Sequence, residues 1–211
     1  MTSIDIDGLK IIFGHLKRIM DENREMLIEL DGVMGDSDLG ITMQKAFTSA
    51  HAEAQGFTGK EAGQLMLKAG MKIAQAAPST MGTLVATGFM KGGKTILKTE
   101  ALSLSDLSVF FRAFTNGIME AGKTKPGNKT IVDALDPAAI ALEEASAEGK
   151  DLAEGIQMAY MAAREGVEHT KSMKAQHGRA AYYQEKSMGV TDAGATVGAL
   201  ILEGFYHGVR E

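Results

Sequence analysis

The chain has 211 residues, of which 45% are hydrophobic and none is cysteine, so it can bury a substantial core but cannot form disulfides, thiolate metal sites or a cysteine nucleophile. Its 22 basic and 27 acidic residues give a net charge of -5, which argues against a nucleic-acid-binding surface. Residues 1–8 do not resemble a signal peptide, and the most apolar run, 81–90, is too short to span a membrane. We therefore expect a cytoplasmic protein that binds neither membranes nor nucleic acid.

Apolar residues recur at spacings of three and four along most of the chain, which is the pattern of amphipathic helices. Thr58 and Glu61 have the spacing of a capping box, as do Ser103 and Asp106. No stretch alternates with period two, so no strands are expected. The pattern predicts eight helices, at residues 9–30, 38–54, 58–76, 82–97, 103–118, 130–147, 152–170 and 192–207.

Helices of similar length with mostly short connections favour an all-α fold, a bundle or closed barrel of eight antiparallel helices. No linker or repeat divides the sequence, so residues 1–211 are expected to form a single domain. Glycines gather with small and polar residues in the connections after the odd-numbered helices, at 32–40, 78–82, 122–129 and 178–194. In an up-and-down arrangement these connections lie at the same end. The sequence therefore predicts one site at one end of the barrel, built from four loops.

The first of these loops is strongly acidic, with Asp31, Asp36 and Asp38 between glycines. Three crowded carboxylates repel one another unless a cation lies among them, and Mg²⁺ prefers such oxygen ligands. The alternative is structural, with Asp36 or Asp38 capping the second helix and the other acids in solvent. A calcium loop of the EF-hand type is excluded, because the twelfth position counted from Asp36 is Phe47 rather than an acid.

Residues 88–95 match the glycine-rich P-loop pattern letter for letter. A P-loop requires a strand before it and a full helix after it. Residues 83–86 could form a short strand, but residues 95–102 are too few for the helix, and no partner strand that ends in a metal-binding aspartate is found. We interpret Gly92 and Gly93 instead as the end of the fourth helix, with Lys94 near its negative pole.

Four motifs in order resemble the L subunit of dihydroxyacetone kinases, over nearly the whole chain. They are the D-x4-D-x-D spacing of the three aspartates, the run 125–130 with the downstream Asp133, the run 178–182, and the run 192–195. This resemblance implies a barrel of eight antiparallel helices that holds ADP or ATP at its open end with two Mg²⁺ ions.

The resemblance also implies site residues. Asp31, Asp36 and Asp38 would be the metal ligands, and Arg179 would contact the phosphates as the catalytic residue. The implied nucleotide contacts are Leu39, Gly40, Ile41, Thr42, Thr80, Met81, Gly122, Ile131, Arg179, Asp192, Ala193 and Gly194. The chain departs from the family pattern at Leu39, Met81, Asn128 and Ala193, where the family has His, Ser, Asp and Pro.

In the family a separate K subunit binds the ketose, and in one branch an M subunit recharges the bound ADP from a phosphohistidine. The resemblance implies both partners for this chain. Two alternatives stay open: an ATP-dependent kinase subunit for another small ketose such as a tetrulose, and a non-catalytic nucleotide-binding co-regulator or lipid carrier. A homodimer through an exposed helix face is also open.

Overall fold

The computed structural model describes residues 2–211, which form nine α-helices and two short 3-10 helices. Within these residues there is no strand, only an isolated antiparallel bridge between Ile4 and Leu102. None of the described helices is long and apolar enough to cross a membrane. The helices are α1 (Ile6–Glu22), α2 (Arg24–Gly32), α3 (Leu39–Gly56), α4 (Ala62–Ala76), α5 (Thr80–Thr95), α6 (Leu104–Gly122), α7 (Val132–Ala147), α8 (Leu152–His169), η1 (Thr170–Ser172), η2 (Arg179–Ser187) and α9 (Ala193–Gly208).

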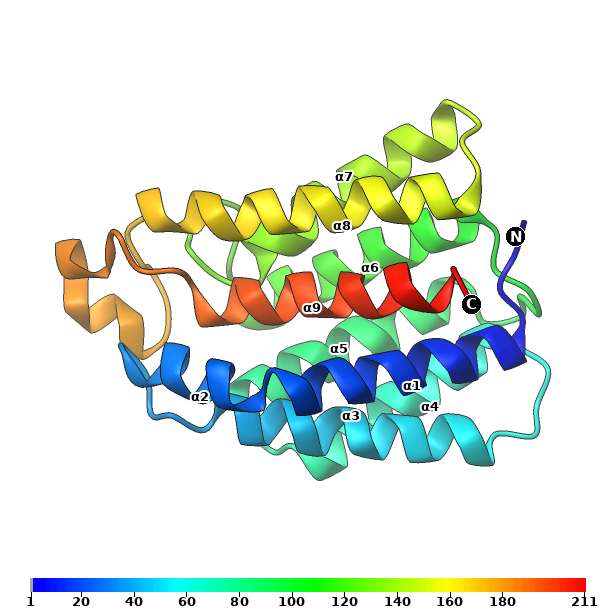
Figure 1. Cartoon of the computed structure of the whole chain (residues 1–211), viewed down its shortest axis with the longest axis horizontal. Coiled ribbons are helices and arrows are strands. Elements are labelled where there is room, and N and C mark those ends of the chain that lie inside the picture. Colours follow the sequence, from blue (N-terminus) through cyan, green and yellow to red (C-terminus); the bar gives the residue numbers. More distant parts are fainter. Residues whose placement is uncertain (1) are drawn as a thin grey trace.

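α2 continues α1 end to end and α1 packs against α3; from α3 on, helices that follow one another pack side by side, and α9 closes the ring against α1 (Figure 1). Each helix turns its apolar face to a common interior, where burial of aromatic and aliphatic surface stabilises the barrel. Seven phenylalanines lie at the centre of this core in a chain of ring contacts: Phe13, Phe47, Phe89, Phe110, Phe111, Phe114 and Phe205. The predicted all-α barrel is confirmed.

The first predicted helix, 9–30, is not continuous, and this part of the prediction is wrong. The chain breaks at Asn23 (φ -95°, ψ 8°), whose side-chain amide donates to the carbonyl of Ile19 at 2.9 Å. A short polar side chain that bonds the preceding turn competes with the helical ladder, a tendency that apolar spacing does not reveal. Together α1 and α2 still carry the chain from one end of the barrel to the other, so the alternation of ends is kept (Figure 1).

The two predicted capping boxes have different outcomes. Ser103 and Asp106 form one at the start of α6, with each side chain accepting the other residue's backbone N–H at 3.2 and 2.9 Å. Thr58 and Glu61 do not, because α4 begins only at Ala62 and its N-cap residue, Glu61, makes no side-chain cap bond.

Residues 88–95 all lie within α5, which excludes a P-loop there, since that loop needs non-helical backbone around the phosphates. The rejection of a P-loop is therefore confirmed, but the prediction that Gly92 and Gly93 end this helix is wrong. Both are helical and buried, and a Cβ atom would lie 2.7 Å from the Phe110 ring at Gly92 and 2.7 Å from the Leu67 nitrogen at Gly93. These glycines let α4 and α6 approach α5 closely.

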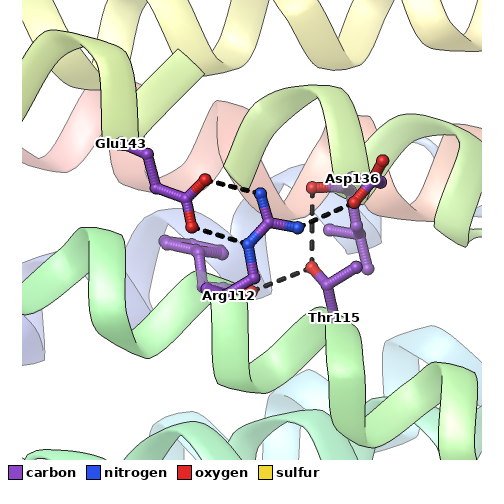
Figure 2. A network of polar contacts seen from close by, with 6 residues as sticks. Arg112, Thr115, Asp136 and Glu143 are labelled. Atoms are coloured by element: carbon purple, nitrogen blue, oxygen red, sulfur yellow. Dashed lines mark hydrogen bonds and ion pairs between the residues drawn. The ribbon is translucent and has the colours of Figure 1, made fainter. Parts of the chain in front are cut away.

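A polar network joins α6 to α7 on the outside of the core (Figure 2). Arg112 donates to both carboxylate oxygens of Glu143 at 2.6 and 2.7 Å and to Asp136 at 2.8 Å. The guanidinium holds the pKa of Glu143 below its usual value. Beneath it, the Thr115 hydroxyl lies 3.5 Å from the Leu135 carbonyl, so the two helices are tied by both charged and neutral bonds.

Four connections lie at the same end of the barrel, as the helix alternation predicts: residues 33–38, 77–79, 123–131 and 170–192 (Figure 1). The described N-terminal residues and the C-terminus lie at the opposite end. The fold thus brings parts of the sequence that are more than a hundred residues apart to one place.

Candidate functional site

The acidic loop follows α2 and leads into α3. Carboxylate oxygens of Asp31, Asp36 and Asp38 all lie within 4.8 Å of one another, with Asp36 and Asp38 exposed and Asp31 half-buried. The turn that gathers them places Ser37 in the left-handed region (φ 61°). A Cβ at Gly35 would lie 2.0 Å from the Asp31 carboxylate, so only glycine fits this close approach.

Asp31 has a structural role besides its place in the cluster. Its Oδ2 atom accepts the backbone N–H of Asp38 at 3.1 Å and of Leu39 at 3.4 Å, at the start of α3. The alternative in which Asp36 or Asp38 caps this helix is wrong: Asp38 is in the N-cap position but makes no side-chain cap bond. Asp31 caps the helix from outside, so neither Asp36 nor Asp38 is used as its cap.

The electrostatics of the loop favour a cation. Burial, and then the charges of Asp36 and Asp31, raise the pKa of Asp38, while the Arg179 guanidinium opposes this rise. Arg179 reaches across from η2, and its Nη2 lies 2.7 Å from Oδ2 of Asp36. Three hard oxygen donors at this separation fit an ion such as Mg²⁺, with positions left for phosphate and water.

The 123–131 connection forms a second wall, organised by Asp133 in the first turn of α7. The Asp133 side chain is buried and accepts the backbone N–H groups of Gly127 at 2.6 Å and Thr130 at 2.7 Å. The Asn128 amide oxygen accepts the N–H of Lys125 at 3.1 Å. No role of its own was predicted for Asp133 from the sequence. Its position three residues after Thr130 has the spacing of a capping pattern, and that spacing indicates the bond from the Thr130 N–H to the Asp133 carboxylate.

Three loops meet at Met81, Ile131 and Gly194. A Cβ at Gly194 would lie 2.9 Å from the Met81 side chain and 3.3 Å from the Ile131 nitrogen. These residues begin α5, precede α7 and begin α9, so the fold brings three of the expected nucleotide contacts together.

The other expected contacts have varied surroundings. Leu39 packs in the core, and Gly40 faces α2, where a Cβ would lie 2.1 Å from the Arg24 carbonyl oxygen. Gly122 lies beside Leu84, at 3.3 Å from a built Cβ. Thr80 is exposed, Thr42 is buried, and Ile41 and Ala193 are half-buried.

Asp192 caps α9 through a 2.6 Å bond from the Ala195 N–H, and its own N–H donates to the Thr170 hydroxyl at 3.0 Å. Burial raises the pKa of Asp192 to about 6, although the Ala195 N–H and the Lys129 ammonium oppose the rise.

This shift predicts a pH dependence of stability. Because the folded-state pKa lies above the ordinary value of 3.8, the folded protein binds this proton more tightly than the unfolded chain does. The resulting stabilisation is present below pH 4 and is lost as the pH rises through 6. The free energy of unfolding is measured with urea at several pH values for wild type and for Asp192→Asn. Across this window, the value for wild type is expected to fall by about 2 to 3 kcal/mol relative to that of the variant. Parallel curves for the two proteins would contradict the prediction.

A groove of about 470 Å³ runs between α8 and α9, lined by residues such as Tyr160, Arg164 and Leu200. It shares no residue with the acidic loop. The candidate site is therefore assigned from the chemistry of its side chains and not from this groove.

Residues 33–207 match the family model of the DAK2 domain, so Asp36 and Asp38 lie inside the match and Asp31 lies two residues before it. The chain is 29% identical over 178 residues to the PEP-dependent dihydroxyacetone kinase, ADP-binding subunit DhaL of Escherichia coli (strain K12), covering 84% of this chain and 85% of that protein. It is 31% identical over 185 residues to the PEP-dependent dihydroxyacetone kinase 1, ADP-binding subunit DhaL of Listeria innocua, with 86% of each covered.

Longer proteins match as well. The L-erythrulose kinase of Pectobacterium atrosepticum is 31% identical over 176 residues, which are 82% of this chain but 30% of that enzyme. The solved dihydroxyacetone kinase of C. freundii in complex with AMP-PNP and Mg²⁺ superimposes with a TM-score of 0.71 at 22% identity, over 93% of this chain and 33% of that one. That likeness shows a shared fold. With a family match over most of its length, the chain is a member of the DAK2 domain family.

Proposed function

We propose that this chain is the nucleotide-binding subunit of a ketose kinase of the dihydroxyacetone type, and that the acidic loop is its magnesium site. One observation carries the proposal: the carboxylates of Asp31, Asp36 and Asp38 lie within 4.8 Å of one another, with Arg179 facing them from a different loop. The two relatives named as ADP-binding subunits, matched over 85% and 86% of their length, support it.

The chemistry of phosphoryl transfer suits this arrangement, because the reaction needs positioning and charge neutralisation more than covalent help. Mg²⁺, when bound, neutralises phosphate charge. Asp31, held by the N–H groups at the start of α3, would fix one side of the ion, and Asp36 and Asp38 would complete the protein's share of its ligands. Arg179 would leave Asp36 and contact the transferred phosphate as the catalytic residue.

The nucleotide would lie along the loops that meet at this end. We propose ADP or ATP, two Mg²⁺ ions, and the following contacts: Leu39, Gly40, Ile41, Thr42, Thr80, Met81, Gly122, Ile131, Arg179, Asp192, Ala193 and Gly194. Met81, Ile131 and Gly194 lie next to one another although they belong to three different loops, and this supports their assignment as contacts of one nucleotide.

The ketose would be held by a separate K-type subunit, and an M-type phosphohistidine subunit would recharge ADP, in a cytoplasmic assembly. The names of the Escherichia coli and Listeria innocua relatives as subunits of PEP-dependent kinases support a phosphohistidine donor. A second candidate is a four-carbon ketose as the acceptor, and the matched L-erythrulose kinase favours it.

A reconstituted assay tests the proposal and separates the candidates. The purified chain is mixed with a K-type subunit, Mg²⁺ and either ATP or a phosphohistidine donor protein with ADP, and phosphorylation of dihydroxyacetone and of erythrulose is measured. We expect transfer that depends on this chain, on nucleotide and on Mg²⁺. Nucleotide binding without transfer to either ketose from either donor would favour a non-catalytic co-regulator.

A further inference from the structure

Lys129 is a buried lysine whose ammonium is surrounded by backbone carbonyls. Its Nζ donates to the carbonyl oxygens of Thr170 at 2.8 Å, Ser187 at 2.7 Å and Val190 at 2.6 Å, and lies 3.3 Å from that of Met173. Only 2% of the residue is exposed. The ammonium therefore occupies the kind of site that carbonyl-rich loops offer to a metal cation.

Such burial is costly, because a charge removed from water must be compensated. Burial lowers the pKa of Lys129, and the charge of Asp192 opposes this. The backbone of Lys129 is also in the left-handed region (φ 59°), which is unfavourable for a residue with a side chain. A residue in this conformation persists where its contacts hold it there, and for Lys129 these contacts are the carbonyls of residues 170–190.

The four carbonyls belong to one excursion of the chain, residues 170–190, which contains η1 and η2 and extends beyond the barrel end (Figure 1, orange). This segment has little core of its own: between 171 and 190 only Ala175 and Ser187 are buried. The ammonium of Lys129 binds the entry of the segment at Thr170 and Met173 and its exit at Ser187 and Val190, and so holds its two ends together.

The tip of this segment carries Arg179, whose only ion-pair partner among the described residues is Asp36, in the acidic loop. Arg179 is exposed, so its own side-chain packing does not determine where it points. Its position depends on the segment beneath it, and that segment is fastened from inside by Lys129. The Asn128 carbonyl, which accepts the Gln176 N–H at 3.2 Å, adds a second link from the same loop.

We propose that Lys129 is a positioning residue for Arg179: its ammonium fastens residues 170–190 to the start of α7 so that the Arg179 guanidinium faces the acidic loop. The consequence for catalysis rests on the proposed function, whereas the fastening itself does not. The two are therefore tested by separate measurements.

The fastening is tested by limited trypsin digestion, since the segment contains Lys171, Lys174, Arg179 and Lys186. Lys129→Met is expected to raise the rate of cleavage within the segment by about 10-fold or more, because charge-assisted bonds of this kind stabilise by roughly that factor or above. Lys129→Gln keeps two N–H donors, so it is expected to show a smaller increase in the rate of cleavage. It also provides the test if the Lys129→Met protein does not fold. Lys125→Met, an exposed lysine of the same loop, is the control.

Positioning is tested by cross-linking, because the chain has no cysteine of its own. Cysteines introduced as Asp36→Cys and Arg179→Cys are joined by a short bismaleimide, and the yield reports how often the two loops face each other. Lys129→Met or Lys129→Gln is expected to lower this yield several-fold, and Lys125→Met is expected to leave it unchanged. Unchanged yield and cleavage in both Lys129 variants would overturn the proposal.

The catalytic consequence is tested by a double-mutant cycle in the reconstituted assay. If Lys129 acts through Arg179, Lys129→Gln lowers turnover in the wild-type background but has little further effect in Arg179→Met. An equal loss in both backgrounds would show a general structural role and overturn the positioning role. If wild type transfers no phosphate, the proposed function fails, while cleavage and cross-linking still decide whether Lys129 positions the loop.

Discussion

Asp36→Asn is expected to weaken Mg²⁺-dependent ADP binding by about 100-fold, since the variant loses one of three anionic ligands while keeping the side-chain shape. Isothermal titration with ADP at fixed Mg²⁺ measures this loss. The fold should tolerate the change, because Asp36 and Arg179 are both exposed and their ion pair contributes little to stability. Equal melting temperatures for the two proteins would show that the loss is local.

The matched control for this experiment is Asp7→Asn. Asp7 is an exposed aspartate in the first turn of α1 that pairs with Lys10, at the opposite end of the barrel. It changes the net charge by the same amount and is expected to leave ADP binding unchanged. If Asp36→Asn also binds ADP with wild-type affinity in Mg²⁺, the acidic loop is not the metal site.

Arg179→Met is expected to lower the rate of phosphoryl transfer by about 1000-fold, the order found when a guanidinium that stabilises transferring phosphate is removed. ADP affinity should fall much less, by about 10-fold, because the metal site and the other three loops remain. Loss of turnover with modest loss of binding is the pattern of a group that acts mainly in the transition state.

Lys186→Met controls for the charge of the segment, since Lys186 is an exposed cation on η2, as Arg179 is. It is expected to transfer phosphate at the wild-type rate. Arg179→Lys should recover only part of the activity, because an ammonium cannot form two parallel bonds to phosphate. A turnover rate in Arg179→Met within a few-fold of wild type would exclude the catalytic role.

Local patterns in the sequence were sufficient for most of the fold. Helices with a clear apolar stripe and a capping pattern, such as α6 with Ser103 and Asp106, begin where the sequence predicts. Two helix boundaries were predicted wrongly. Asn23 interrupts a helix that the apolar stripe predicts to be continuous, and Gly92 and Gly93 lie inside a helix because the neighbouring helices pack too closely for a side chain. Packing of the neighbouring helices decided the outcome at Gly92 and Gly93, whereas the break at Asn23 comes from a local side-chain bond that apolar spacing does not reveal.

The sequence by itself determined the all-α class and the three carboxylates of the acidic loop, because each depends on spacing along one stretch of chain. It also determined which loops share an end of the barrel, because that follows from the alternation of the helices. Only the tertiary structure decided that Asp31, and not Asp36 or Asp38, caps α3, that Arg179 faces Asp36, and that Lys129 holds the segment between them. These are contacts between residues up to 143 positions apart. Distances of that kind are set by how the helices close into a barrel, which no local pattern of residues specifies.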